Sequence, residues 1–140
     1  MSWEVNGVNA VEVAAGVITR QDKLLIAERP HSKPYNGYWE FPGGKLDPPE
    51  SAKQALHREL QEELGITIQS CHHLFDHTYD YPTRKVNISF WHVTGFDGEP
   101  QGKEEQALAW VEFIKLTNYP LLPANLIILP LLQKRLRCTR

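Results

Sequence analysis

The chain has 140 residues, of which 41% are hydrophobic, and its formal net charge is −2. This length and apolar content predict a single domain, residues 1–140, with a substantial core. The slightly negative charge argues against a protein that holds a nucleic-acid polymer through a broad basic face, so any nucleotide ligand should be small.

No targeting or membrane segment is evident. The N-terminal apolar run has no basic cluster before it, as a signal peptide would, and the apolar run at 127–133 is too short to span a bilayer. Cys71 and Cys138 lack zinc-binding spacing, so we expect two free thiols. These features predict a cytoplasmic protein with no membrane partner, and we expect a monomer.

Five segments predict strands. Four are rich in β-branched and aromatic residues and are bounded by turn residues: 11–19, 23–29, 86–93 and 109–116. Residues 20–22 are few enough to join the first two strands as a hairpin. A weaker strand pattern covers 71–81, and the Pro-Thr-Arg segment after it can turn the chain into the strand at 86–93.

One helix is predicted between the strands, at 52–64. Ser51 and Gln54 have the spacing of a capping box, and Gly65 stands where a left-handed C-cap residue belongs. A start in the Asp-Pro-Pro-Glu segment at 47–50 is the alternative.

A second helical pattern lies near the C-terminus, at 123–136. Because Pro130 cannot lie unperturbed in a helix interior, it must either kink this helix or begin its more regular part.

The helix at 52–64 carries a cluster of acids. On a helical wheel Glu59, Glu62 and Glu63 share an arc of roughly 100°, beside an apolar stripe of leucines that can pack on a sheet. The ordinary interpretation is a solvated acidic face. Against it, Glu59 and Glu63 form a like-charge i,i+4 pair, and two of the acids lie in the last turn, where the helix dipole disfavours anions.

A divalent cation would remove both penalties. Clustered carboxylates suit Mg²⁺, or Mn²⁺ as a substitute, and such ions keep open positions for water and phosphate oxygens. Arg58 can pair with a carboxylate and fix its rotamer, although an ordinary surface ion pair is the alternative. Directly before the helix, Gly43 and Gly44 can bring backbone groups close to a metal or a phosphate; alone they would indicate a turn.

These residues match a known signature. The segment from Gly44 to Ile66 fits every fixed position of the Nudix box, G-x5-E-x7-R-E-U-x-E-E-x-G-U, where U is aliphatic. The chain therefore resembles the Nudix family, which implies an α/β fold, an α/β/α sandwich with a mixed β-sheet. The segments EFPGGK, QGKEEQ (101–106) and PAN (123–125) look like the MutT branch, which hydrolyses 8-oxo-dGTP to the monophosphate and pyrophosphate.

The resemblance implies a ligand set for the metal: the Gly43 carbonyl, Glu59, Glu62, Glu63 and Glu104, with Glu104 as ligand or general base. Glu105 is adjacent, so the register of that last assignment is open by one residue. Arg58 is counted with these catalytic residues. The chemistry is attack of water on phosphorus in a nucleoside triphosphate.

The resemblance also implies a pocket for the nucleotide, lined by Arg29, Glu40, Phe41, Pro42, Gly43, Lys45, Tyr81, Arg84 and Asn125. The Asn125 amide can donate and accept at once, which suits the protonated N7 and the O6 of an oxidised guanine. For Phe41 and Tyr81, core packing is the alternative. Where the family has a histidine in the loop after Arg29, this chain has Pro34, so the contacts of the loop that contains His31 and Lys33 are open.

Two other functions compete with 8-oxo-dGTP hydrolysis. A Nudix pyrophosphatase for CTP, 5-methyl-dCTP or dATP would share the box and differ in the pocket. A non-catalytic Nudix-like sensor would usually lack box acids or carry a second domain, whereas this chain has every box acid.

Overall fold

A computed structural model describes residues 2–5 and 8–138. The elements in chain order are β1 (Ser2–Val5), β2 (Val8–Arg20), β3 (Lys23–Glu28), β4 (Trp39–Glu40), β5 (Gly43–Lys45), α1 (Ala52–Leu64), β6 (Thr67–Tyr81), β7 (Arg84–Asp97), β8 (Leu108–Glu112), the 3₁₀ helix η1 (Phe113–Asn118), α2 (Pro123–Leu126) and α3 (Leu129–Cys138). In this described part, no helix is long and apolar enough to cross a membrane.

The strands form a mixed sheet centred on β2. The hydrogen-bonded order is β4-β3-β2-β7-β6, while β1 and β5 also pair with β2, and β8 pairs with β3. β2 and β7 run parallel, with Val13 opposite Ile88, and the other pairings between these strands are antiparallel. The predicted mixed sheet is confirmed.

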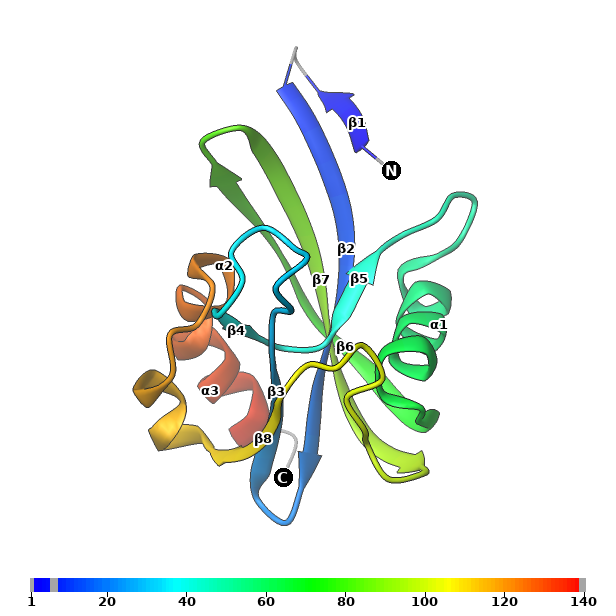
Figure 1. Cartoon of the computed structure of the whole chain (residues 1–140), viewed down its shortest axis with the longest axis vertical. Helices are drawn as coiled ribbons and strands as arrows, with labels where there is room; N and C mark the ends of the chain where they lie inside the picture. The colour runs from blue at the N-terminus through cyan, green and yellow to red at the C-terminus, as the bar shows by residue number, and fades with distance from the viewer. Residues whose placement is uncertain (1, 6–7, 139–140) are drawn as a thin grey trace.

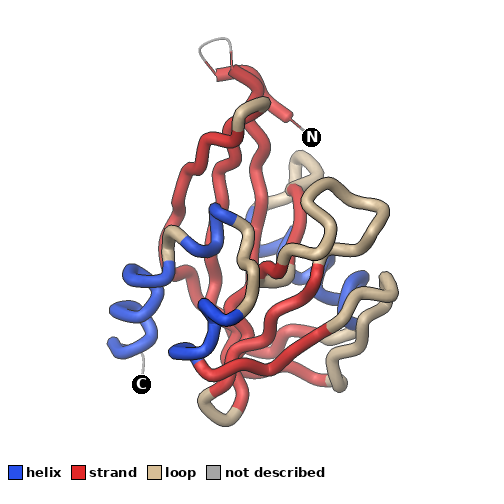
Figure 2. Tube along the Cα trace, turned by 60° about the vertical axis from the view of Figure 1, so that its left-hand side comes forward, coloured by secondary structure: helices blue, strands red, loops and turns tan. Residues whose placement is uncertain are grey.

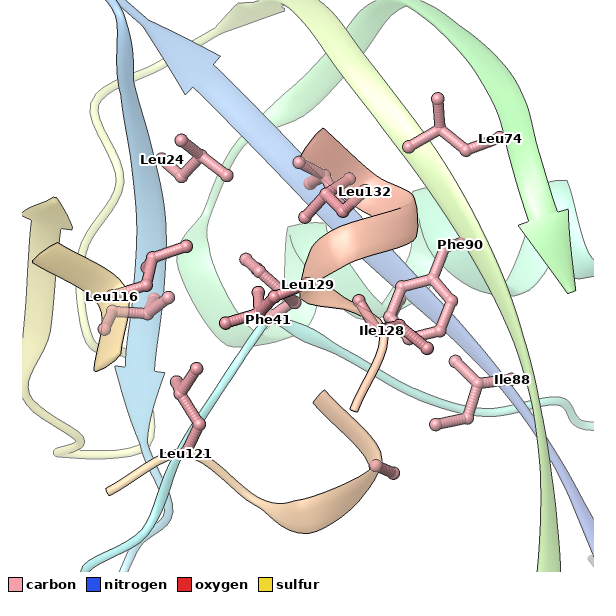
Figure 3. Close-up of a cluster of buried hydrophobic side chains, with 14 of the residues drawn as sticks. Leu24, Phe41, Leu74, Ile88, Phe90, Leu116, Leu121, Ile128, Leu129 and Leu132 are labelled. Carbon is pink, nitrogen blue, oxygen red and sulfur yellow. The ribbon is translucent and has the colours of Figure 1, made fainter. Parts of the chain in front are cut away.

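Helices cover both faces of this sheet, as Figures 1 and 2 show. On one face Leu56, Leu60 and Leu64 of α1 are fully buried in a cluster with residues of β2, β3, β6 and β7. On the other face Ile128 and Leu132 pack with Phe90 of β7 in a second cluster (Figure 3). The α/β/α sandwich is therefore confirmed, and it leaves the acidic side of α1 outside both clusters.

Both ends of α1 are capped as the sequence predicts. The Ser51 hydroxyl accepts a hydrogen bond from the Gln54 backbone N–H at 3.1 Å, and the Gln54 side chain accepts one from the Ser51 N–H at 2.8 Å. Gly65 is left-handed, with φ of 72°, and its N–H bonds to the Gln61 carbonyl. These caps fix where the helix begins and ends, so the alternative start at 47–50 is wrong.

The C-terminal third differs from the prediction in two places. The predicted strand at 109–116 stops at Glu112, because Phe113 and the buried Leu116 follow the three-residue period of η1 and turn to the core. The segment from 123 forms two helices, and Pro130 is the second residue of α3, so it begins a helix and does not kink one.

The two predicted hairpins are present. Gln21 and Asp22 both have positive φ, 53° and 63°, which is the geometry of a tight turn between β2 and β3. The weaker strand extends further than predicted, over Thr67–Tyr81, and Tyr81 pairs with Arg84 at its end. Cys71 is a free thiol; the Cys138 side chain lies outside the described residues.

Candidate active site

Two glycines let the β5 segment approach both the sheet and α1. A Cβ atom on Gly43 would lie 2.0 Å from the backbone oxygen of Ala14, and one on Gly44 would lie 2.4 Å from the carboxyl carbon of Glu59. Neither position accepts a side chain without movement of its neighbour. The first glycine therefore seats the strand on β2, and the second makes room for a predicted metal ligand.

Arg58 is the centre of the polar network at the start of the site. Its guanidinium holds Glu50 through two hydrogen bonds of 2.6 and 2.9 Å and bonds Glu59 at 2.9 Å and Glu62 at 3.3 Å. A further bond of 3.1 Å reaches the Lys45 carbonyl. The hydrogen bonds from Arg58 lower the pKa of Glu50 to about 2. Arg58 thus positions two of the acids and joins α1 to the loop before it.

Glu63 is the buried member of the acid cluster. It is 7% exposed, and its Oε2 atom accepts no hydrogen bond from any described residue. Burial, with the charges of Glu59, Glu40 and Glu104, raises the pKa of Glu63 to about 9. A buried carboxylate among other carboxylates is costly, and a bound cation is the partner that would offset the cost.

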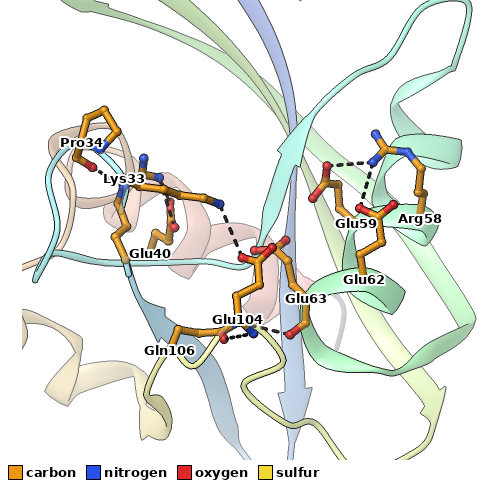
Figure 4. A network of polar contacts seen from close by, with 10 residues as sticks. Lys33, Pro34, Glu40, Arg58, Glu59, Glu62, Glu63, Glu104 and Gln106 are labelled. Carbon is orange, nitrogen blue, oxygen red and sulfur yellow. Dashed lines mark hydrogen bonds and ion pairs between the residues drawn. The ribbon is translucent and has the colours of Figure 1, made fainter. Parts of the chain in front are cut away.

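The loop between β7 and β8 is fastened to the C-terminal end of α1. The Gln106 amide donates to the Glu63 carbonyl at 3.2 Å and accepts from the Glu104 N–H at 2.8 Å, and the Lys103 N–H also donates to the Glu63 carbonyl. These bonds satisfy a helix-end carbonyl that would otherwise lack a partner. They also place Glu104 beside Glu63 (Figure 4).

The predicted metal ligands come together, but not as a finished metal site. Within residues 2–5 and 8–138, no three acidic, histidine or cysteine side chains are close enough to hold an ion as they stand. Glu59 and Glu62 are turned to Arg58, whereas Glu63 and Glu104 face each other (Figure 4). Glu104 pairs with Lys33 at 3.5 Å and faces Glu63 (Figure 4), an arrangement that fits the first of the two registers.

The unpartnered Glu63 oxygen and the surrounding acids fit a hard divalent cation. Glu59, Glu62, Glu63 and Glu104 would hold it, with the Gly43 carbonyl. These roles remain predictions.

Asn125 lies in α2 and is joined to the segment between β4 and β5. Its side chain is 5% exposed, and its Oδ1 atom accepts a hydrogen bond of 2.8 Å from the Phe41 N–H. That donor fixes the amide orientation, and Nδ2 makes no hydrogen bond to the described residues. The Phe41 ring packs in the core, which was the alternative prediction for this residue. Its backbone N–H sets the orientation of the Asn125 amide.

The remaining predicted pocket residues differ in their exposure and in the hydrogen bonds and ion pairs that they make. Arg29 is held by its ion pair with Glu40 at 3.0 Å and by a bond of 2.8 Å to the Pro34 carbonyl. Burial raises the pKa of Glu40, and the Arg29 charge opposes that shift. The Pro42 carbonyl accepts from the Gly16 N–H. Lys45 and Arg84 are exposed, and Tyr81 is half-buried at the edge of the core.

Two residues at the site, Gln106 and Tyr35, were not predicted from the sequence, and the contacts of a third, Lys33, were left open. Gln106 lies in the QGKEEQ segment that the sequence analysis named, but nothing in the sequence indicates its hydrogen bond to the Glu63 carbonyl. Lys33 pairs with Glu104 at 3.5 Å, and the Tyr35 ring lies 5.5 Å from that of Tyr81. Both are in the loop between β3 and β4, and their partners are remote in sequence, so no local spacing predicts these contacts.

The comparison with known families agrees with this geometry. The family model described as the NUDIX domain matches residues 10–132. The chain belongs to the Nudix hydrolase family. The chain is 42% identical to the CTP pyrophosphohydrolase of Escherichia coli, over 85% of this chain and 88% of that one. It is 36% identical to the 8-oxo-dGTP diphosphatase of the same organism, over 82% and 90% of the two chains.

A solved structure supports the fold over nearly the whole chain. The solution structure of the E. coli ORF135 protein matches this Nudix hydrolase with a TM-score of 0.82 and 38% identity, covering 99% of this chain and 98% of that one. The fold and the family are therefore shown, whereas the two relatives above differ in the nucleotide that their names give.

The site of this Nudix hydrolase has the groups needed for attack of water on a phosphoryl group. A divalent ion held by these acids would neutralise phosphate charge and lower the pKa of an attacking water. From the chain itself, Arg58 holds the Glu59 carboxylate, and the Gln106 bonds hold the loop that carries Glu104 against the end of α1.

Proposed function

We propose that this Nudix hydrolase uses Mg²⁺, or Mn²⁺ in its place, to hydrolyse 8-oxo-dGTP to 8-oxo-dGMP and pyrophosphate, and so removes a mutagenic precursor of DNA replication from the cytoplasmic nucleotide pool. The observation that carries the proposal is the buried, oriented amide of Asn125. In this role the enzyme works as a monomer on a free nucleotide.

The Asn125 amide presents a donor and an acceptor side by side. Its Nδ2 is free to donate to the O6 of the base, and the second lone pair of Oδ1, the first being used by Phe41, is free to accept from a protonated N7. Unmodified guanine has no proton on N7, so two acceptors would face each other there. Leaving such a buried group unpaired costs about 1 to 3 kcal/mol, which supports discrimination of about tenfold or more against dGTP.

CTP is the second candidate, and two observations favour it. The relative at 42% identity is named for that activity. In addition, the adjacent N4 amino group and N3 atom of cytosine also form a donor and acceptor pair, which the same amide can match. For a guanine presented by its N7–O6 edge, the orientation of Asn125 therefore supports rejection of dGTP more strongly than it separates 8-oxo-dGTP from CTP.

The other residues have supporting roles in this proposal. Glu59, Glu62, Glu63, Glu104 and the Gly43 carbonyl hold the metal, and Arg58 positions the acids. The Glu40–Pro42 backbone, Arg29, Lys45, Tyr81 and Arg84 line the nucleotide cleft.

The deciding experiment compares kcat/KM for 8-oxo-dGTP, dGTP and CTP, measured by release of pyrophosphate. We expect the oxidised nucleotide to be preferred over both others by more than tenfold. A preference for CTP would move the assignment to the second candidate. Absence of Mg²⁺-dependent pyrophosphate release from all three would refute the enzyme proposal.

Two variants of Asn125 separate recognition from structure. Asn125→Asp keeps an oxygen that accepts from the Phe41 N–H but removes the two N–H donors of the amide. Asn125→Ala removes the acceptor as well as the donors. We expect Asn125→Asp to raise KM for both guanine nucleotides, because the donor to O6 is lost, but to keep the preference for 8-oxo-dGTP, because an oxygen still faces N7. Asn125→Ala should lose that preference while the melting temperature stays within a few degrees. If Asn125→Ala loses activity on dGTP as strongly as on 8-oxo-dGTP, Asn125 does not read the base.

A further inference from the structure

Lys33 is a cation placed inside the acid cluster. Its Nζ atom lies 3.5 Å from Glu104 Oε1, and its charge partly offsets the upward shifts that burial gives the pKa of Glu40 and of Glu63. These acids come from three separate segments, β4, α1 and the loop before β8. Figure 4 shows the lysine side chain extending toward Glu104, with Glu63 beside Glu104.

Contacts within and around the loop between β3 and β4 hold the backbone that carries Lys33. The Lys33 N–H donates to the Pro30 carbonyl at 3.1 Å, and the next residue, Pro34, is held by Arg29 at 2.8 Å. One residue further, the Tyr35 ring contacts that of Tyr81. Tyr35 also has a positive φ of 59°, an unfavourable conformation for a bulky residue that the surrounding contacts must sustain.

An ordinary surface ion pair is a poor account of Lys33. Its side chain and that of Glu104 are 43% and 41% exposed, so the pair contributes little to the stability of the fold. The two arginines nearest the acids are already paired, Arg58 with Glu50, Glu59 and Glu62, and Arg29 with Glu40. In the ion pairs of the described residues, Glu104 has one cationic partner, Lys33.

We propose that Lys33 is an exchangeable counter-cation of the acid cluster, which pairs with Glu104 in the free enzyme and transfers to the phosphate oxygens of the substrate when a divalent ion takes the carboxylates. This inference rests on the proposed metal-dependent hydrolysis. An ammonium group is a compact point charge with three donors, and it serves a carboxylate and a phosphate equally well. Because two cations compete for Glu104, binding of the ion releases the lysine toward the triphosphate.

The exchange predicts two opposite effects of one substitution. Lys33→Met removes the competitor, so Mn²⁺ should bind the nucleotide-free enzyme roughly three- to tenfold more tightly. The same variant loses a phosphate contact, so KM for the nucleotide should rise about tenfold while kcat changes less. A lysine with a purely structural role would change neither value in these directions.

Mn²⁺ binding is measured by electron paramagnetic resonance on nucleotide-free protein, at low and at high ionic strength. The matched control is Lys115→Met, which removes an exposed ion pair with Glu112 of similar length, 3.3 Å, outside the site. We expect the gain in Lys33→Met to shrink in high salt and to be absent in Lys115→Met. Lys33→Arg should restore the affinity of the parent for Mn²⁺.

Equal or weaker Mn²⁺ binding by Lys33→Met overturns the proposal, and so does an unchanged KM. Melting temperatures of both methionine variants establish that the fold is retained. The Mn²⁺ measurement needs no substrate, so it stays informative even if the substrate panel refutes the proposed nucleotide hydrolysis.

Discussion

Glu63→Gln should stabilise the metal-free protein while removing a predicted metal ligand. The carboxyl group of Glu63 is buried among other acids, and its pKa in the folded state is about 9. In the unfolded chain a glutamate has a pKa of about 4.3. The folded state therefore binds a proton that the unfolded state lacks across this range, and the stability of the parent falls as the pH rises from about 4.3 toward 9.

The size of this effect follows from the pKa difference. Each pH unit above the unfolded pKa contributes about 1.36 kcal/mol, so the full penalty at pH 8 is about 5 kcal/mol. Water penetration and local relaxation reduce such penalties, and we expect about 2 to 3 kcal/mol. For a chain of this length that corresponds to about 5 to 10 °C in the melting temperature. Glutamine has the shape of the protonated acid but requires no proton uptake.

Thermal unfolding in EDTA at pH 5, 6.5 and 8 measures this gain. The difference between Glu63→Gln and the parent should be small at pH 5 and largest at pH 8. Mn²⁺ should raise the melting temperature of the parent more than that of the variant. Glu62→Gln is the matched control, because the Glu62 side chain is 57% exposed and its removal should change stability by less than about 1 kcal/mol. A gain that is absent at pH 8, or constant from pH 5 to 8, would show that Glu63 is not a destabilising buried acid.

Two further substitutions test how the acids are positioned. Gly44→Ala places a methyl group against the flexible carboxyl end of Glu59. We expect kcat to fall at least tenfold, while the melting temperature changes by only a few degrees. A normal kcat would mean that the position of the Glu59 carboxylate does not matter for turnover. Arg58→Lys loses the paired hydrogen bonds to Glu50, so kcat should fall roughly tenfold or more. The pKa of Glu50 should rise from its low value in the parent, so the pH of acid unfolding in circular-dichroism titrations should move upward. An unchanged pH of acid unfolding would show that the Glu50 ion pair does not contribute to the stability of the fold.

The elements that the sequence predicts well are those whose signals are local. The helix at 52–64 is found at its predicted bounds because Ser51, Gln54 and Gly65 each act on the backbone within one turn. The strand at 109–116 is overestimated, since burial of Leu116 against the C-terminal helices decides the conformation there, and that packing is not local. The two- and three-residue strands β4 and β5 are too short to leave a periodic pattern.

The same distinction applies to the site. The acids of α1 and the role of Arg58 as their partner are visible in the sequence, because helical spacing brings them together. The contacts of Gln106, Lys33 and Tyr35 join segments that only the folded chain brings together. The orientation of the Asn125 amide belongs to this second group, since it depends on a backbone N–H of β4's neighbouring residue Phe41.

The hydrogen bond from the Phe41 N–H to Asn125 also fixes the distance between Asn125 and the acids. Phe41 is two residues from Gly43, and the buried Pro42 between them is tied to β2 through the Gly16 N–H. The backbone group that orients the proposed base contact, Asn125, and the glycines beside the acids therefore belong to one short, anchored stretch of chain. A base that sits badly against Asn125 shifts its own phosphates relative to the acids, so the wrong nucleotide should be penalised in its turnover rate as well as in its affinity.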